Sequence, residues 1–307
     1  MSEIKDANFM GVRKVAAALS IILLVASIAS LAFQGLKLGL DFTGGTLIEV
    51  EYESKADLKA IRDSLEGAGY RDVIVQNFGS ETDILLRMSE AYRANLGDEV
   101  LAKLQESEGN KVELRRAEFV GAQVGEELRD QGGLALLLAL AVVMLYVAAR
   151  FQFKFSVASV LALVHDVVII LGIFSIFQFE FDLTVMAALL AVIGYSLNDT
   201  IVVADRIREN FRIIRQMAPI DVINRSLTQT LGRTVVTSFT TLLVLLALLW
   251  IGGENIYYFA MALSIGVVVG TYSSIYVAAN ILLAMEISRE DLLPPETEED
   301  DELDAIP

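Results

Sequence analysis

Cysteine is absent from the 307 residues, and histidine and tryptophan each occur once. Without thiols the chain has no disulfide, no thiol nucleophile and no cysteine-based metal site. One histidine excludes clustered histidine ligation, and no glycine-rich loop leads into Lys-Ser or Lys-Thr, which excludes an ATP-hydrolysing P-loop. We therefore expect no enzyme, no cofactor and no metal. Any energy that the protein uses has to come from a partner or from an ion gradient.

Positive charge is also scarce, because 24 Lys and Arg stand against 40 Asp and Glu, for a net charge of −16. No basic patch is present, so nucleic-acid binding is not expected. The acidity is concentrated in two segments, 34–133 and 288–307, each with a net charge of −8. Both are therefore expected to face water, and residues 288–307 are expected to form a disordered cytoplasmic tail.

Six apolar runs are long enough to cross a bilayer, which takes about 20 residues. They lie at roughly 14–33, 134–149, 156–177, 183–204, 234–251 and 256–285. We predict an α-helical polytopic membrane protein with the N-terminus and span 1 in residues 1–34 and spans 2–6 in residues 134–287. The first run could also be a cleaved signal peptide, but it is longer than the apolar region of such peptides. An uncleaved anchor is therefore the expectation.

Lys and Arg gather at alternate ends of these runs. They lie before span 1, between spans 2 and 3 and between spans 4 and 5, whereas the short loops 178–182 and 252–255 contain none. Because short cytoplasmic loops collect Lys and Arg, both termini are predicted to be cytoplasmic, in a bacterial inner membrane. Residues 35–133 are then predicted to be periplasmic.

The segment 35–133 alternates strand and helix patterns. In 46–52, Ile48, Val50 and Tyr52 alternate with Glu49 and Glu51, which is the period of a half-buried strand. Further strands are predicted at 73–78, 83–88 and 112–119, and helices at 54–67 and 90–106, with 79–82 as a hairpin connection. The order β-α-β-β-α-β is typical of an α+β ferredoxin-like fold. Its scattered carboxylates are typical of a solvated face and suggest no catalytic pair.

Polar residues inside the spans are the candidate functional residues, because an ionisable group in a membrane helix costs several kcal/mol. Asp199 lies about 15 residues into span 4, roughly 22 Å from its outer end, and Arg233 begins span 5 at a comparable depth. Asn198, Ser196 and Thr200 are expected to line a polar chain beside Asp199. Alternatively, Asp199 and Asn198 only hydrogen-bond neighbouring helices, and Arg233 only sets the orientation.

His165 and Asp166 form a second polar pair, in span 3. Histidine titrates near physiological pH, so a proton relay is one interpretation. Adjacent residues point about 100° apart on a helix, which means that the two cannot both face one partner. A structural role, or support beside the Asp199 site, is therefore favoured.

Span 6 contains a stripe of small residues. Gly266, Gly270, Ser264 and Ser274 recur at helical spacing on it. Small residues let membrane helices approach closely, so the stripe predicts tight packing and no chemistry.

Three segments, 39–45, 191–210 and 231–234, carry motifs that resemble those of the SecD/SecF family of protein-export membrane proteins. The first follows span 1 and reads Gly39-Leu40-Asp41-Phe42-Thr43-Gly44-Gly45. Its residues alone indicate a turn at the junction between membrane and domain, with no Lys and no helix start for a phosphate. The second is 191–210, which is closer to the SecF branch than to the SecD branch. The third is 231–234, followed by polar residues of span 5, and the resemblance covers all but the acidic tail.

The resemblance implies a partner and a mechanism. In that family a SecD and a SecF subunit pair, each with six spans arranged like half of an RND-type transporter. The pair assists the SecYEG channel and the SecA motor, and couples inward proton flow to the forward movement of an unfolded polypeptide. The family motif assigns proton transport to the positions of Asp199 and Arg233.

Two other functions stay open. An RND-type exporter of small molecules also uses proton-coupled six-span halves, but it joins two of them in one chain and carries larger outer domains. A non-conducting structural subunit of the translocon would not require a carboxylate buried in a polar cluster. Whether the coupling ion is H⁺ or Na⁺ is also open.

Overall fold

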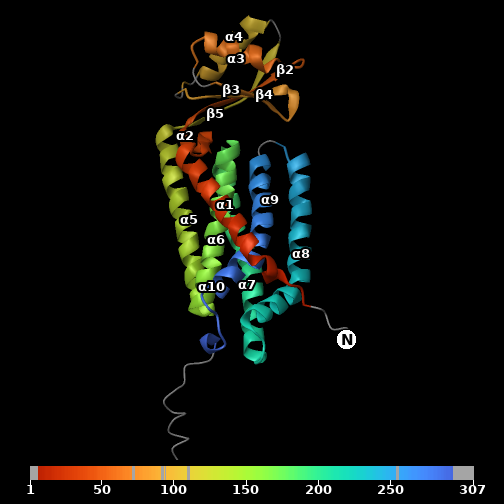
Figure 1. Ribbon diagram of the computed structural model, residues 1–307. Coiled ribbons are helices and arrows are strands. Elements are labelled where there is room, and N and C mark those ends of the chain that lie inside the picture. Colours follow the sequence, from red (N-terminus) through yellow and green to blue (C-terminus); the bar gives the residue numbers. More distant parts are fainter. Residues whose placement is uncertain are drawn as a thin grey trace, which may run out of the picture.

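The computed structural model describes residues 6–70, 73–90, 93, 95–108, 111–253 and 256–292. It consists of a bundle of long helices with a small α/β domain above one end (Figure 1). Most of the expected acidic tail, residues 293–307, and part of the loop 252–255 lie outside the described residues.

Six helices are long and apolar enough to cross a membrane, as the sequence predicts. Five of them are α1 (Arg13–Phe33, after the short η1, Phe9–Val12), α5 (Ala122–Arg150), α6 (Phe153–Phe177), α7 (Leu183–Ile213) and α8 (Pro219–Ile251). The sixth begins as α9 (Tyr257–Tyr272), passes through the π-helical turn η3 (Ser273–Val277) and ends as α10 (Ala278–Ala284).

The helices extend beyond the apolar runs. α5 begins at Ala122, well before residue 134, and α7 continues to Ile213. The arginine-rich stretch between spans 4 and 5 is therefore mostly helix, and only residues 214–218 separate α7 from α8. The first turns of α8 lie across the base of the bundle before the helix rises beside α9 (Figure 1).

Small residues set the closest helix contacts. A Cβ added at Gly266 of α9 would lie 2.2 Å from a methyl of Val192 on α7, and one at Gly172 of α6 would lie 2.0 Å from the Ser27 hydroxyl on α1. Only glycine allows these backbones to approach so closely. The packing stripe predicted for span 6 is therefore present on the face of α9 that contacts α7.

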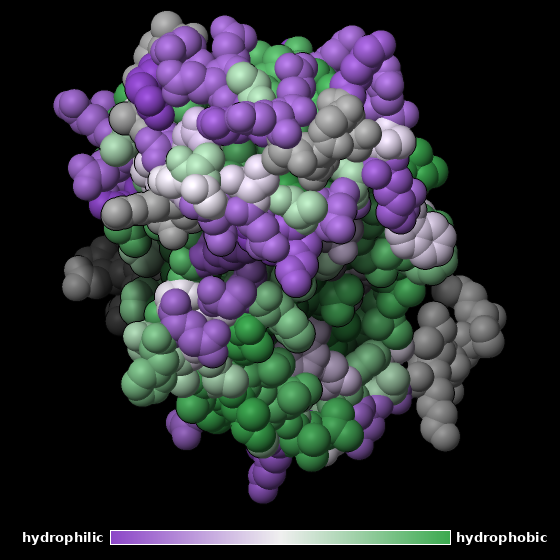
Figure 2. Space-filling view, turned by 90° about the horizontal axis from the view of Figure 1, so that it is seen from above, coloured by the Kyte–Doolittle hydropathy of each residue, from purple (hydrophilic) through white to green (hydrophobic). Residues whose placement is uncertain are grey.

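The outer domain has a four-stranded antiparallel sheet in the order β3-β4-β2-β5. The elements follow the chain as β2 (Gly45–Tyr52), α3 (Leu58–Gly67), β3 (Ile74–Phe78), β4 (Ser80–Met88), α4 (Leu96–Glu108) and β5 (Val112–Val120). Order and topology are those of the ferredoxin-like fold. Ile48, Val50 and Tyr52 are buried on one face, which confirms the predicted strand pattern. Polar side chains cover the outside of the domain, and apolar ones emerge beside it on the bundle (Figure 2).

Three boundaries in this domain differ from the prediction. α3 begins at Leu58 and not at residue 54, because Asp57 itself is the N-cap and accepts hydrogen bonds from the backbone of Lys59 and Ala60. α4 begins at Leu96 and not at residue 90. The connection between β3 and β4 is shorter than 79–82, since Gly79 adopts φ +79° and the next strand starts at Ser80.

The glycine motif after span 1 forms the root of the domain. Residues Leu40–Thr43 make a short helix, α2, where the sequence suggested only a turn. Gly44 and Gly45 follow with φ of +71° and +136°. A Cβ at Gly44 would lie 2.7 Å from the backbone of Ala122, and one at Gly45 would lie 2.7 Å from the Met88 carbonyl. The paired glycines therefore let the chain pass between α5 and the sheet.

Three other contacts fix this root to the bundle. The Asp41 carboxylate accepts a hydrogen bond from the backbone N–H of Leu183, 3.0 Å away, at the start of α7. Phe42 is buried, and its ring stacks on that of Phe181 with centroids 5.8 Å apart. The segment β1 (Lys37–Leu38) pairs in parallel with β6 (Glu180–Phe181). The motif residues Asp41, Phe42, Thr43, Gly44 and Gly45 thus act together as the junction that their sequence indicated.

Candidate functional site

Asp199 lies in the interior of α7, and only 3% of its surface is exposed. Its Oδ2 atom is buried without a hydrogen-bond partner among the described residues. The neighbouring groups that act on its charge are Arg233 and Ser238, both on α8. A carboxylate in the middle of a membrane helix thus has one oxygen free and a guanidinium on the next helix.

Arg233 is exposed on the surface of the single chain. Among the described residues it makes no ion pair with Asp199 within 4.0 Å, although its charge acts on that carboxyl group. The structure therefore places the two predicted residues near each other without an ion pair between them. An arginine that is close and unpaired can move toward the carboxylate or away from it.

The three residues expected beside Asp199 lie elsewhere. Ser196 donates to Asp166 at 2.6 Å, Thr200 shares a hydrogen bond with Ser274 at 2.9 Å, and Asn198 is exposed. The reason is helical geometry, because each residue turns the direction by about 100°. Residues 198 and 200, each one position from Asp199, consequently point about 100° away from it, whereas Ser196, one turn earlier on a neighbouring face, hydrogen-bonds to Asp166 on α6.

The polar residue that does lie beside Asp199 is Ser238, which was not among the predicted site residues. Its hydroxyl shares a hydrogen bond of 2.7 Å with Thr271 on α9 and accepts one of 3.4 Å from Tyr195 on α7. These hydroxyls form a polar connection across three helices. Ser238 could have been named as a candidate from the sequence, since it is a polar residue five positions after Arg233 on the same span. Its position beside Asp199 could not, because that depends on how α7 and α8 are rotated against each other.

His165 and Asp166 bond to each other. Nδ1 of His165 lies 3.0 Å from Oδ1 of Asp166, and both residues are buried, with 3% and 0% of their surface exposed. The interpretation that the two cannot share one partner missed this arrangement, because the side chains meet although their Cα–Cβ bonds diverge. Ser196 and Ser273 donate to the other carboxylate oxygen at 2.6 and 2.8 Å.

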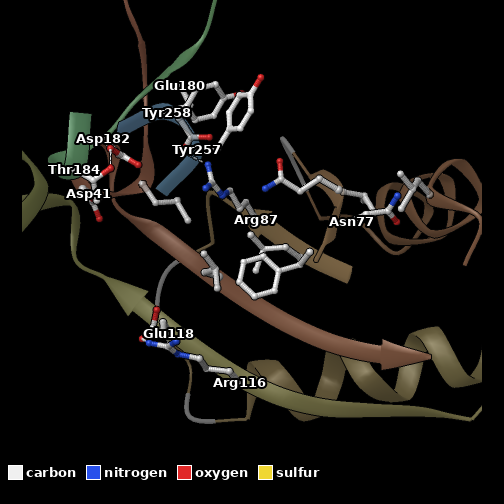
Figure 3. A pocket seen from close by; sticks show the side chains of 17 residues that line it. Asp41, Asn77, Arg87, Arg116, Glu118, Glu180, Asp182, Thr184, Tyr257 and Tyr258 are labelled. Carbon is white, nitrogen blue, oxygen red and sulfur yellow. Dashed lines mark hydrogen bonds and ion pairs between the residues drawn. The ribbon is translucent and has the colours of Figure 1, made fainter. Parts of the chain in front are cut away.

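A cavity of about 730 Å³ separates the sheet of the outer domain from the top of the bundle. Figure 3 shows Arg87 on β4 directed toward Glu180, with Tyr257 and Tyr258 beside them and Asp41 and Asp182 at one side. Arg87 and Glu180 form an ion pair whose side chains are only 18% and 10% exposed. The pair was not predicted, because its members are far apart along the chain and the strand pattern, which placed Arg87 in a strand at 83–88, carries no information about a partner on the bundle.

Asp199 contributes a buried, ionisable carboxyl group to the bundle. Among the described residues, no three of the types His, Cys, Asp and Glu are grouped closely enough to hold a metal ion. A buried carboxylate such as that of Asp199 can instead exist with or without a proton, and the energy difference between the two forms depends on the distance of a movable cation.

The chain is similar to known membrane proteins over nearly its whole length. Residues 99–288 match the C-terminal family of protein export membrane proteins SecD/SecF, and residues 29–56 match the SecD/SecF GG motif. Protein translocase subunit SecF of Pseudomonas aeruginosa is 53% identical over 293 residues, which are 95% of each chain. The subunit of the same name from Vibrio alginolyticus is 49% identical over 307 residues, covering 99% of this chain and 98% of that protein.

Solved structures are similar as well. The crystal structure of SecDF, a translocon-associated membrane protein from Thermus thermophilus, superposes with a TM-score of 0.83 at 38% identity and covers 93% of this chain. A structure of SecDF in a super-membrane-facing form gives a TM-score of 0.71. The chain spans 39% of the length of either SecDF chain.

Proposed function

The chain belongs to the SecD/SecF family, and we propose that it acts with a SecD subunit as an auxiliary part of the bacterial Sec export machinery. In this role the pair couples inward proton flow to the movement of an unfolded polypeptide across the inner membrane. SecYEG is the channel that it assists, and SecA supplies the ATP-driven part of the same process. The protein itself carries no nucleotide chemistry.

One observation carries the coupling part of the proposal, namely the carboxyl group of Asp199. It is 3% exposed, its Oδ2 has no hydrogen-bond partner in the part of the chain that the structure describes, and Arg233 acts on its charge from the next helix. Holding an ionisable group in a membrane helix costs several kcal/mol. A carboxylate with a purely structural role would have hydrogen-bond partners for both oxygens, whereas a proton carrier needs one oxygen without such a partner.

The partner side of the proposal is supported by polar residues on the outside of the bundle. Asn198, Arg233 and Thr240 are exposed on the single chain at the level of the membrane-spanning helices. Amide and guanidinium groups facing lipid are costly, which favours a second protein chain over this face. This chain matches 39% of the length of the SecDF chain, and the rest of that chain is long enough to contain such a partner.

We further propose that the membrane is the inner membrane and that both termini are cytoplasmic. The support is the distribution of Lys and Arg, which flank the ends of the spans opposite the outer domain. The six helices make the protein multi-pass. In this orientation the ferredoxin-like domain is periplasmic, where an emerging polypeptide can reach it.

The test is Asp199→Asn, studied together with SecD in energised vesicles that contain a stalled precursor. The amide keeps the shape and most of the hydrogen bonding of the carboxyl group but cannot take up a proton. We expect folding, association with SecD and ATP-driven initiation to persist, while export stimulated by the gradient is lost. The gradient supplies about 2.3 kcal/mol per charge at 100 mV, so the loss is measurable.

The matched control is Asp205→Asn, a carboxylate on the same helix that pairs with Arg208 at 2.8 Å and is half exposed. It should export like the wild type. An Asp199→Asn protein that is fully active and still sensitive to an uncoupler would show that the proton path does not run through Asp199, and would overturn this part of the proposal.

A further inference from the structure

The buried pair on α6 is a cluster that the Asp199 site does not use. Asp166 is completely buried and accepts three hydrogen bonds, from His165 at 3.0 Å, Ser196 at 2.6 Å and Ser273 at 2.8 Å. Both serine hydroxyls donate to one carboxylate oxygen, as an ionised carboxylate accepts them. His165 then donates through Nδ1–H to the other oxygen.

The other ring nitrogen of His165 is open. Nε2 is buried and has no hydrogen-bond partner among the described residues. His165 lines a cavity of about 430 Å³ between α1, α6 and the end of span 6. The atom that would gain or lose a proton is therefore the one directed away from the carboxylate.

The groups that surround His165 and Asp166 leave this pair as the proton-binding site in this part of the bundle. Tyr272 of α9 stacks on the His165 ring with centroids 6.2 Å apart, and its hydroxyl contacts Ser20 and the Ala16 carbonyl of α1. Tyr276 of η3 lies beyond Tyr272. The membrane-embedded parts of α1, α5 and α10 contain no Asp, Glu, Lys or Arg. On α7 the titratable groups near Ser196 in sequence are Tyr195, directly before it, and Asp199, three residues after it.

The hydrogen bonds also connect the pair to the helix of Asp199. The π-helical turn η3 presents two consecutive serines, of which Ser273 binds Asp166 and Ser274 binds Thr200 on α7. Ser196 of α7 binds Asp166 directly. π-helical turns are rare and occur frequently at functional sites. Asp166 thus holds both α7 and the π turn through single hydroxyl groups.

We propose that His165 and Asp166 form a second proton-binding site, whose protonation state reaches the Asp199 helix through the hydroxyls of Ser196 and Ser273. A proton that binds to Nε2 converts the neutral imidazole to imidazolium, while the Nδ1–H group keeps its hydrogen bond to Asp166. The charge of the pair changes from −1 to 0. The charge of an imidazolium stabilises the carboxylate, so hydrogen bonds from hydroxyl groups stabilise it less. The bonds from Ser196 and Ser273 can then break, which lets α7 and η3 move away from Asp166.

The first experiment uses the fact that the chain contains a single histidine. The full chain, with ¹⁵N-labelled histidine and no histidine tag, is placed in lipid nanodiscs and its ring signals are recorded from pH 5 to 8. We expect signals of imidazolium, with Nε2 newly protonated and Nδ1 protonated throughout, to appear as the sample is acidified. Signals that stay constant over the range would overturn the proposal. This measurement needs no variant, so a folding defect cannot obscure it.

The second experiment tests the connection to α7. The pH profile of gradient-stimulated export, measured with SecD, is compared for Ser196→Ala and Ser273→Ala. Ser264→Ala is the matched control, because the Ser264 hydroxyl donates only within its own helix, to the Ala260 carbonyl. We expect the first two variants to move the profile along the pH axis and the control to coincide with the wild type. Three coinciding profiles would show that the pair is not coupled to α7.

This connection rests on the proposed function, and the two can fail separately. If Asp199→Asn keeps full coupling while the His165 signals still titrate, the transport role of Asp199 is wrong and the second site stands. If coupling is lost in Asp199→Asn and the His165 signals are constant, the reverse holds. The Asp199→Asn variant should leave the His165 titration in place.

Discussion

Arg87 on β4 and Glu180 in the loop between α6 and α7 form an ion pair that joins the outer domain to the membrane bundle. The two side chains are only 18% and 10% exposed, which makes this pair far more buried than Lys55–Glu81 in the same domain, at 72% and 66%. Glu180 is held by the β1–β6 pairing, so its position is fixed by the bundle. The pair therefore fixes the orientation of the outer domain relative to the bundle, with the cavity between them.

Removing one member of this pair should free the domain. We expect Glu180→Gln to leave the Arg87 charge partly buried without a partner, at a cost of about 3–5 kcal/mol to the docked arrangement. The measurement is the distance distribution between spin labels on α3 and on the outer end of α8, which should broaden. Glu81→Gln breaks an exposed pair worth at most about 1 kcal/mol and should leave it narrow. Equal distributions in both variants would show that the pair does not position the domain.

Much of the fold could be predicted because its signals are local. Apolar length identified the six spans, and the alternation in 46–52 identified a strand whose residues Ile48 and Val50 are indeed buried. The helix starts were harder, since several polar residues before α3 can act as a cap. Asp57 became the N-cap because its side chain reaches two backbone N–H groups, which depends on how the strand before it ends.

The site was less predictable, because it depends on how the helices are rotated against each other. Polarity within a span marks Asp199 and His165 as candidates without any structure. That Ser196 serves Asp166, and that Ser238 lies beside Asp199, follows from the register between α7, α6 and α8. No pattern within one helix contains that information.

The orientation can be tested with cysteines, since the native chain has none to compete. Glu66 on α3 and Gln216 between α7 and α8 are both exposed, so a thiol at either position is accessible. An impermeant thiol reagent applied to intact spheroplasts should label Glu66→Cys and spare Gln216→Cys. Disrupting the membrane should expose both. Labelling of position 216 alone in intact cells would reverse the proposed topology.

The segment after α10 should undock in acid. Lys154 contacts Asp291 at 2.7 Å, and Ser288 donates to the same oxygen through its backbone and its hydroxyl. Burial alone raises the pKa of Asp291, but the hydrogen bonds from Lys154 and Ser288 outweigh it, so the pKa lies below its ordinary value. A lowered pKa adds stability above the unfolded pKa of about 3.9, and this stability is lost as the pH falls through the folded pKa.

A fluorophore on residue 290 should therefore report a fixed segment at neutral pH and a progressively freer one as the pH falls from about 4 through the lowered pKa of Asp291. Asp291→Asn should give the freer signal at neutral pH too, because the amide removes the charge that Lys154 binds. An Asp291→Asn protein that still shows the acid-dependent change would assign that change to another group.

The contact between α7 and α9 provides a stability test that is independent of any transport assay. A Cβ at Gly266 would lie 2.2 Å from a methyl of Val192, whose β-branched side chain has few alternative rotamers. Gly266→Ala should therefore destabilise the bundle by about 1–3 kcal/mol through overpacking. Gly133→Ala, where nothing lies within 4 Å, should instead stabilise α5 by up to about 1 kcal/mol through helix propensity.

The decisive variant is the double substitution of Gly266→Ala with Val192→Ala, which removes the methyl groups that the new Cβ would strike. Unfolding in mixed micelles with increasing denaturing detergent measures five proteins on one scale: the wild type, Gly266→Ala, Val192→Ala, the double variant and Gly133→Ala. We expect the double variant to recover part of the loss, because the added and removed methyl groups occupy the same space between α7 and α9. If Gly266→Ala were as stable as Gly133→Ala, or if the losses at Gly266 and Val192 were simply additive, the close approach at Gly266 would not be what holds these helices together.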